Sequence, residues 1–137
     1  MEFIKIFLDS CVVFKLFRQY IMWSNLSNSK LLQNDEYIYV ISDYVIQEVI
    51  DNIEIKYKIN WLEYVDWFLK ITKFGIASFV WIDKNIYMYT KDTDDAKILY
   101  DCIKSNCKIL LTDNVKDFKI DNIYNDFDIL VRWYIMK

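Results

Sequence analysis

The chain has 137 residues, of which 55% are hydrophobic and 18% aromatic, so it can bury one core and is too apolar to be disordered. It contains no His and a single Gly, which excludes catalysis by a His-activated nucleophile and a Gly-rich phosphate-binding loop. The 17 basic residues against 20 acidic ones, a net charge of −3, argue against a broad basic surface for nucleic acid.

The three cysteines are an odd number without a Cys-x-x-Cys pair, which argues against a disulfide framework and a zinc site. No stretch of about 18 residues is free of charge, so no membrane span is expected. The first segment carries Glu2, Lys5 and Asp9 and is not typical of a signal peptide. We therefore expect one cytoplasmic domain over residues 1–137.

The first half of the chain predicts two strands and two helices. Residues 3–8 form an apolar run typical of a buried strand, and residues 11–24 carry apolar side chains at helical spacing. Residues 24–36 are rich in Ser, Asn and Gln and predict a loop or a frayed helix end. Residues 37–41 predict a second strand, after which Ser42 stands at the N-cap position of a second helix.

The second half predicts the same alternation of helices and strands. A helix is expected over residues 60–73, a strand over 76–82 and a polar connection over 83–92. Thr93 is the expected cap of a helix that reaches about residue 105. Two further apolar runs predict strands at residues 108–111 and 129–133.

Apolar strands that alternate with helices are typical of a parallel sheet covered on both faces. The predicted fold class is therefore α/β, in three layers, with a parallel sheet of about five strands flanked by helices. In such sheets the functional crevice lies outside the carboxyl ends of the strands, so the residues that follow each strand are the first candidates for a site.

Polar side chains gather near these strand ends and in the first turns of the helices. The candidates are Asp9, Ser42, Glu48, Asp94, Asp95, Thr112, Asp113, Asn114 and Asp117. Because the first and fourth strands are neighbours in a doubly wound sheet, we expect Asp9 to lie close to the residues that follow Thr112. Asp95, in the first turn of its helix, is expected to point into the same crevice.

Each of these residues also has a structural explanation when it is taken alone. Asp94 and Asp95 stand where the helix dipole favours an acid by ~0.3–1 kcal/mol, Ser42 is a helix cap, and Glu48 is an ordinary helical acid. Together, several carboxylates without His or Cys make a hard oxygen site, which suits Mg²⁺ or Mn²⁺ rather than Zn²⁺. The matching reaction is metal-assisted hydrolysis of a phosphodiester.

Four segments, in this order along the chain, resemble the motifs of the PIN-domain nucleases. They are a strand that ends in Asp9 followed by Ser10, Ser42 with Glu48 six residues later, Asp95 in a helix-opening turn, and a strand-ending Thr112 before an acidic and amide cluster. The resemblance spans nearly the whole chain. The chain is also short, which is similar to the VapC-like toxins of bacterial toxin–antitoxin pairs.

The resemblance implies a PIN-like fold and a Mg²⁺- or Mn²⁺-dependent endoribonuclease that forms a homodimer and is inhibited by an antitoxin protein. Carried over by position, Asp9, Glu48 and Asp95 would bind the metal, and Asn114 would complete its ligand shell. Supporting roles would fall to neighbouring polar residues, which are Ser10, Ser42, Asp94 and Thr112.

Asn114 departs from the family pattern, which often has Asp two residues after the Thr. Asn offers a carbonyl oxygen but no negative charge, so Asp113 or Asp117 is expected to supply the missing acid. The sequence leaves open whether the site binds one metal ion or two. This departure and the net negative charge favour an alternative, a catalytically inactive PIN-like fold that binds protein or RNA. The three retained metal-binding acids argue against that alternative.

Binding of an RNA substrate requires positively charged side chains near the candidate acids. Basic residues flank the candidate acids along the chain and could rim the crevice and bind phosphates: Lys15, Arg18, Lys91, Lys97, Lys116 and Lys119. The competing explanation is that they are solvated charges on helix faces.

Overall fold

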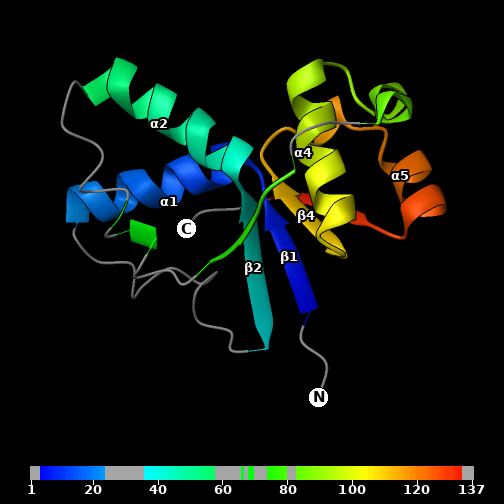
Figure 1. Cartoon of the computed structure of the whole chain (residues 1–137), viewed down its shortest axis with the longest axis horizontal. Coiled ribbons are helices and arrows are strands. Elements are labelled where there is room, and N and C mark those ends of the chain that lie inside the picture. Colours follow the sequence, from blue (N-terminus) through cyan, green and yellow to red (C-terminus); the bar gives the residue numbers. More distant parts are fainter. Residues whose placement is uncertain are drawn as a thin grey trace.

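In the computed structural model, the described residues are 4–23, 36–57, 66, 68–69, 74–79 and 83–133, and helices alternate with strands along them (Figure 1). The strands are β1 Ile4–Leu8, β2 Tyr37–Ser42, β3 Gly75–Ala77, β4 Ile109–Thr112 and β5 Leu130–Trp133. The helices are α1 Ser10–Trp23, α2 Asp43–Tyr57, α4 Thr93–Lys104 and α5 Ile120–Phe127, with 3₁₀ turns η2 Lys84–Tyr89 and η3 Val115–Asp117. No helix in these ranges is both long and apolar enough to span a membrane.

The five strands form one parallel sheet in the order β3-β2-β1-β4-β5. The chain order reverses at β1, which has β2 on one side and β4 on the other. Leu8 pairs with Leu111, so Asp9 and Thr112 stand side by side at the carboxyl edge. This confirms the predicted parallel α/β sheet and its predicted switch point.

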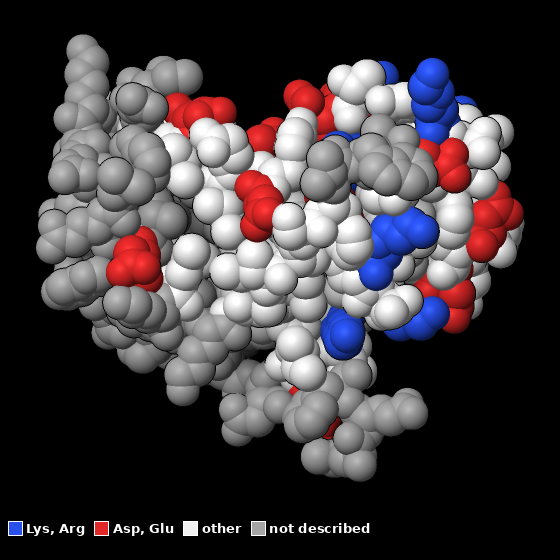
Figure 2. All heavy atoms as spheres, in the orientation of Figure 1, with Lys and Arg blue, Asp and Glu red and all other residues white. Residues whose placement is uncertain are grey.

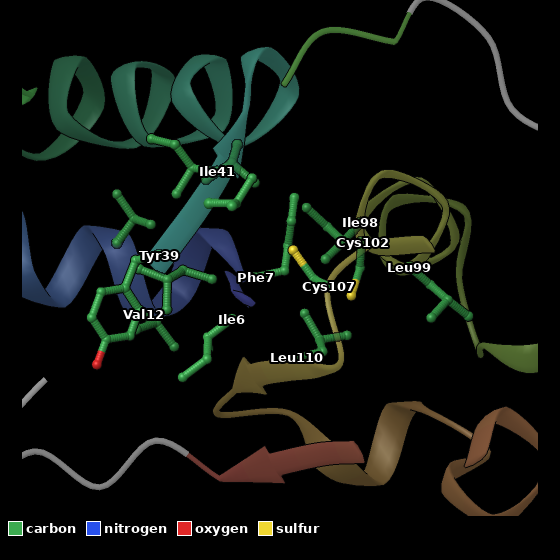
Figure 3. Packing of buried hydrophobic residues seen from close by; sticks show 14 of the residues in the cluster. Ile6, Phe7, Val12, Tyr39, Ile41, Ile98, Leu99, Cys102, Cys107 and Leu110 are labelled. Carbon is green, nitrogen blue, oxygen red and sulfur yellow. The ribbon is translucent and has the colours of Figure 1, made fainter. Parts of the chain in front are cut away.

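The core fills both faces of the central strands. Ile6, Phe7 and Leu8 are all buried although successive side chains of a strand point to opposite faces, so helices must cover both sides. Figure 3 shows Phe7 between Val12 of α1 on one side and Ile98 and Cys102 of α4 on the other. Helices therefore cover both faces of the sheet beside the carboxyl ends of β1 and β4.

Several predicted element boundaries differ from the observed ones by one residue, and two of the differences change the interpretation. Among the described residues 74–79, the third strand is Gly75–Ala77, since these residues pair with β2; residues 80–82 of the predicted strand 76–82 lie outside the described residues. The cap of α4 is Asp92 rather than Thr93, since the Asp92 side chain accepts the hydrogen bond that the helix N-terminus offers. By contrast, Ser42 caps α2 as predicted, with its Oγ accepting from the Val45 N–H at 3.3 Å.

Three elements were not predicted. The 3₁₀ turn η2 lies within the expected polar connection 83–92, and η3 and α5 follow β4. Their segments are short and rich in Asp, Asn and Lys, so their apolar spacing is too brief to indicate a helix. The predicted loop 24–36 and helix 60–73 fall largely outside the described residues; of the helix, Asp66, Phe68 and Leu69 are described as helical.

Candidate functional site

Asp9 lies at the carboxyl end of β1 and is almost fully buried, with 3% of its surface exposed. Its Oδ1 accepts hydrogen bonds from the Ser10 N–H at 2.6 Å and the Ser10 hydroxyl at 3.3 Å, while Oδ2 accepts one from the Thr112 hydroxyl at 2.7 Å. Burial raises the pKa of Asp9, and these hydrogen bonds lower it. The carboxylate is therefore held in one orientation at the switch point of the sheet.

The turn that follows β4 is fastened to the start of α1. Thr112 Oγ1 accepts a hydrogen bond from the Asn114 N–H at 3.0 Å, and Cys11 Sγ accepts one from the Asp113 N–H at 3.4 Å. Burial raises the pKa of Cys11 to about 12, so its thiol stays protonated at neutral pH. Asp113 forms an ion pair with Lys15, and Asn114 is exposed. The charge of Asp113 is thus already balanced by a lysine.

Glu48 approaches the same acids from α2. Its Oε1 atom is buried and has no hydrogen-bond partner among the described residues. Burial, followed by the negative charges of Asp9 and Asp94, raises the pKa of Glu48 to about 7, although a hydrogen bond with Ser10 lowers it. The carboxylate of Glu48 therefore lies within the electrostatic reach of acids from two other elements.

The start of α4 contributes three more carboxylates. Asp92 is the N-cap, and its Oδ1 accepts a hydrogen bond from the Asp95 N–H at 2.9 Å. Asp94 is exposed and accepts a hydrogen bond from the Tyr44 hydroxyl of α2. Asp95 is 9% exposed, and its Oδ2 lacks a hydrogen-bond partner in the described part of the chain. Burial and the charges of Asp92 and Asp9 raise the pKa of Asp95 to about 8.

Asp117 reaches these acids from η3. The N–H of Lys91, just before α4, donates to the Asp117 carbonyl at 3.0 Å and holds the two segments together. Asp92, Asp95 and Asp117 each offer a carboxylate oxygen within 4.8 Å of the other two. We call these three residues the α4–η3 acid cluster.

Ser42 and Lys97 contact a different buried acid, Asp101. Burial raises the pKa of Asp101, whereas hydrogen bonds with Lys97 and Ser42 lower it. Lys97 Nζ lies 2.7 Å from Asp101 Oδ1 and also donates to the carbonyl of Phe79. The expectation that Lys97 rims the crevice is therefore wrong, since its charge is used inside the fold.

Acidic side chains line both sides of the hollow between α2 and α4 (Figure 2). Within the described ranges, no Lys or Arg forms an ion pair with Asp9, Glu48 or Asp95. An all-oxygen, negatively charged set of this kind is typical of sites that bind hard divalent cations.

No family model matches the sequence, and no curated protein matches it. Among solved structures, a chain in the crystal structure of VapBC2 from Rickettsia felis, bound to a DNA fragment from their promoter, superposes with a TM-score of 0.60. The match covers 96% of this chain and 100% of that one at 17% identity. The chain has a VapC-like PIN fold. A chain of VapBC-1 from nontypeable Haemophilus influenzae matches at a TM-score of 0.49 and 14% identity over 96% of this chain and 97% of that one.

Identities this low show a shared fold, so any activity of this PIN fold must be argued from its own residues. Asp9, Glu48 and Asp95 lie near one another at the edge of the sheet where the sequence predicts them. Asn114 is exposed. The sequence reasoning missed Asp92, although an acid at the N-cap position three residues before Asp95 was the available signal.

The raised pKa values of Glu48 and Asp95 predict that the metal-free protein becomes less stable as the pH rises. Their pKa values of about 7 and about 8 lie above the ordinary 4.5 and 3.8, so near neutral pH the folded state holds more protons than the unfolded state. We expect the free energy of unfolding to fall by about 1–3 kcal/mol from about pH 5 to 8, allowing for solvent screening.

Thermal unfolding in EDTA measures this effect, with the Glu48→Gln variant as the comparison. Gln removes one of the two shifted carboxylates and keeps the shape of the side chain, so the variant should lose less stability over the same pH range. An equal fall in both proteins would contradict the assignment of the effect to these acids.

Proposed function

We propose that the chain is a divalent-metal-dependent endoribonuclease that hydrolyses RNA phosphodiester bonds. The observation that carries the proposal is the convergence of Asp9, Glu48 and Asp95 near the carboxyl ends of β1 and β4, with no Lys or Arg paired to them in the described ranges. Carboxylates this close repel one another, and a divalent cation relieves that repulsion.

The donor set fits Mg²⁺ or Mn²⁺. Every candidate ligand is an oxygen, and two buried oxygens, Glu48 Oε1 and Asp95 Oδ2, have no hydrogen-bond partner among the described residues. Asp9, Glu48 and Asp95 would hold the ion, with the amide oxygen of Asn114 as a fourth ligand. When bound, such an ion lowers the pKa of a water molecule and so supplies the nucleophile.

The protein's own contribution is to orient these ligands and to exclude water from behind them. The Ser10 and Thr112 hydroxyls hold the two oxygens of Asp9 in fixed directions, as outer partners of metal ligands commonly do. Burial of Asp9 lowers the local dielectric constant, which strengthens its attraction for a cation.

Exposed lysines near the acids would bind the phosphates of RNA. Lys91 precedes α4, and Lys116 and Lys119 flank Asp117. Contacts of this kind position the backbone without reading the bases. We therefore propose RNA as the substrate and assign no sequence preference.

We also propose that the protein is a cytoplasmic toxin that forms a homodimer and is inhibited by an antitoxin. The support is the likeness in fold to a chain of VapBC2, whose structure includes promoter DNA, together with the four motifs that resemble VapC-like toxins. Co-expression with a neighbouring small protein, followed by co-purification, tests this partner.

The activity is tested by incubating the purified protein with single-stranded RNA in Mg²⁺ or Mn²⁺. We expect internal cleavage that stops when EDTA is added and returns when the metal is restored in excess. A folded protein that leaves RNA intact with either metal would refute the nuclease. The inactive binding module, which the exposed Asn114 favours, would then be the better account.

A further inference from the structure

Tyr44 joins the helix that carries Glu48 to the helix that carries Asp95. The start of α2 lies beside α4 (Figure 1), and the Tyr44 hydroxyl donates a hydrogen bond from α2 to Asp94 Oδ1 in the first turn of α4. Tyr44 lies one turn before Glu48 on the same face of α2, and Asp94 directly precedes Asp95. The hydrogen bond therefore connects the neighbours of two acids that come from different elements.

The surroundings of Tyr44 keep its hydroxyl in place as a donor. The side chain is half-buried and packs against the hydrophobic core, whereas Asp94 is exposed. Burial, the hydrogen bond with Asp94 and then the negative charge of Glu48 raise the pKa of Tyr44 well above its ordinary value. The hydroxyl thus stays protonated at neutral pH, between acids of the two helices.

The acids of α2 and α4 repel one another when no cation is bound. After burial, the negative charges of Asp9 and Asp94 raise the pKa of Glu48, so Glu48 interacts with the start of α4. A neutral donor such as Tyr44 joins the two helices against this repulsion and leaves the negative charge that attracts a cation intact. A lysine at the same position would instead pair with the acids and compete with a metal ion.

We propose that Tyr44 is a positioning residue of the metal site, because its hydrogen bond to Asp94 fixes α2 against α4 and so holds Glu48 and Asp95 together for one cation. The inference rests on the proposed function and deepens it, since it assigns part of the affinity for the metal ion to a residue that does not contact the ion. Ligands that are ordered before the ion arrives lose less freedom on binding, which raises affinity.

Calorimetric titration of the EDTA-stripped protein with Mn²⁺ tests the proposal in a double-mutant cycle of Tyr44→Phe and Asp94→Ala. Phe keeps the ring in the core and removes only the hydroxyl. We expect Tyr44→Phe to weaken Mn²⁺ binding by about tenfold, and to have no further effect when Asp94→Ala is already present. Asp94→Asn should lose less affinity than Asp94→Ala, because both remove the charge but Asn keeps an oxygen that accepts from Tyr44.

Two matched controls report effects that do not depend on this hydrogen bond. Tyr124→Phe removes a hydroxyl at an exposed position of α5, where no hydrogen-bond partner for it lies among the described residues. Asp121→Asn removes one charge from an exposed position in the first turn of α5. Both variants should bind Mn²⁺ with wild-type affinity, and thermal unfolding in EDTA checks that Tyr44→Phe is folded at the temperature of the titration.

Mn²⁺ binding of wild-type affinity in Tyr44→Phe, or an equal effect of this change with and without Asp94, would overturn the positioning role. RNA cleavage measured on the same samples separates this result from a failure of the proposed function. Weaker Mn²⁺ binding by Tyr44→Phe, without cleavage in any sample, would support the positioning role and refute the nuclease. Cleavage with a raised KM for RNA, by a Tyr44→Phe variant of unchanged Mn²⁺ affinity, would do the reverse and identify Tyr44 as an RNA contact.

Discussion

Replacing Asp9 with Asn will lower the rate of RNA cleavage by about 10³-fold or more and leave the protein folded. A bound cation contributes several kcal/mol to phosphodiester hydrolysis, and each 1.36 kcal/mol is tenfold in rate. Asp9 is the acid at the centre of the switch point, and Asn keeps an oxygen to accept the Ser10 hydrogen bonds while removing the charge. Cleavage of a fluorescent RNA under single-turnover conditions measures the effect.

Two further measurements separate this result from misfolding. The Asp9→Asn variant should unfold at a higher temperature than the wild type at pH 8 in EDTA, because it no longer buries a carboxylate with a raised pKa. Asp121→Asn should cleave at the wild-type rate. Activity of Asp9→Asn within about tenfold of the wild type would show that Asp9 does not hold an essential ion.

Replacing Asp95 with Asn will weaken Mn²⁺ binding and reduce cleavage as strongly as the change at Asp9. Asp95 is almost buried, and its pKa is raised by burial and by the negative charges of Asp92 and Asp9, so its carboxylate lies beside other acids of the proposed metal site. The start of α4 should survive the change, since the Asp92 cap accepts from the backbone N–H of residue 95. Mn²⁺ calorimetry and RNA cleavage measure the two losses.

Mn²⁺ binding of wild-type affinity in Asp95→Asn would show that Asp95 is not a ligand of the proposed ion.

The sequence was sufficient for the sheet and for the pairing of Asp9 with Thr112. Both depend on strong local signals, because the apolar runs of β1 and β4 are long enough to identify and parallel α/β topology places their ends together. Ser42 was equally predictable, since a hydroxyl between a strand and an apolar helical stripe is the usual N-cap.

The sequence did not predict contacts that depend on short irregular segments. Asp117 lies beside Asp95 because a hydrogen bond from the Lys91 N–H holds η3 to the segment before α4. No periodic pattern in the sequence indicates such a contact. The cap of α4 was placed one residue late because Asp92 and Thr93 are both good caps and only the backbone geometry distinguishes them. The ion pair of Lys97 was not predicted, because the sequence does not show that its partner Asp101, one turn further along the same helix, is fully buried.

The most direct test of the central claim is a calorimetric titration of the EDTA-stripped wild type with Mg²⁺ and Mn²⁺, beside Asp9→Asn under the same conditions. The acids at the carboxyl ends of β1 and β4 predict saturable binding in the wild type, and the loss of the site that contains Asp9 in the variant. Absence of binding in the wild type, or equal binding by the two proteins, would contradict the claim that these acids form a metal site.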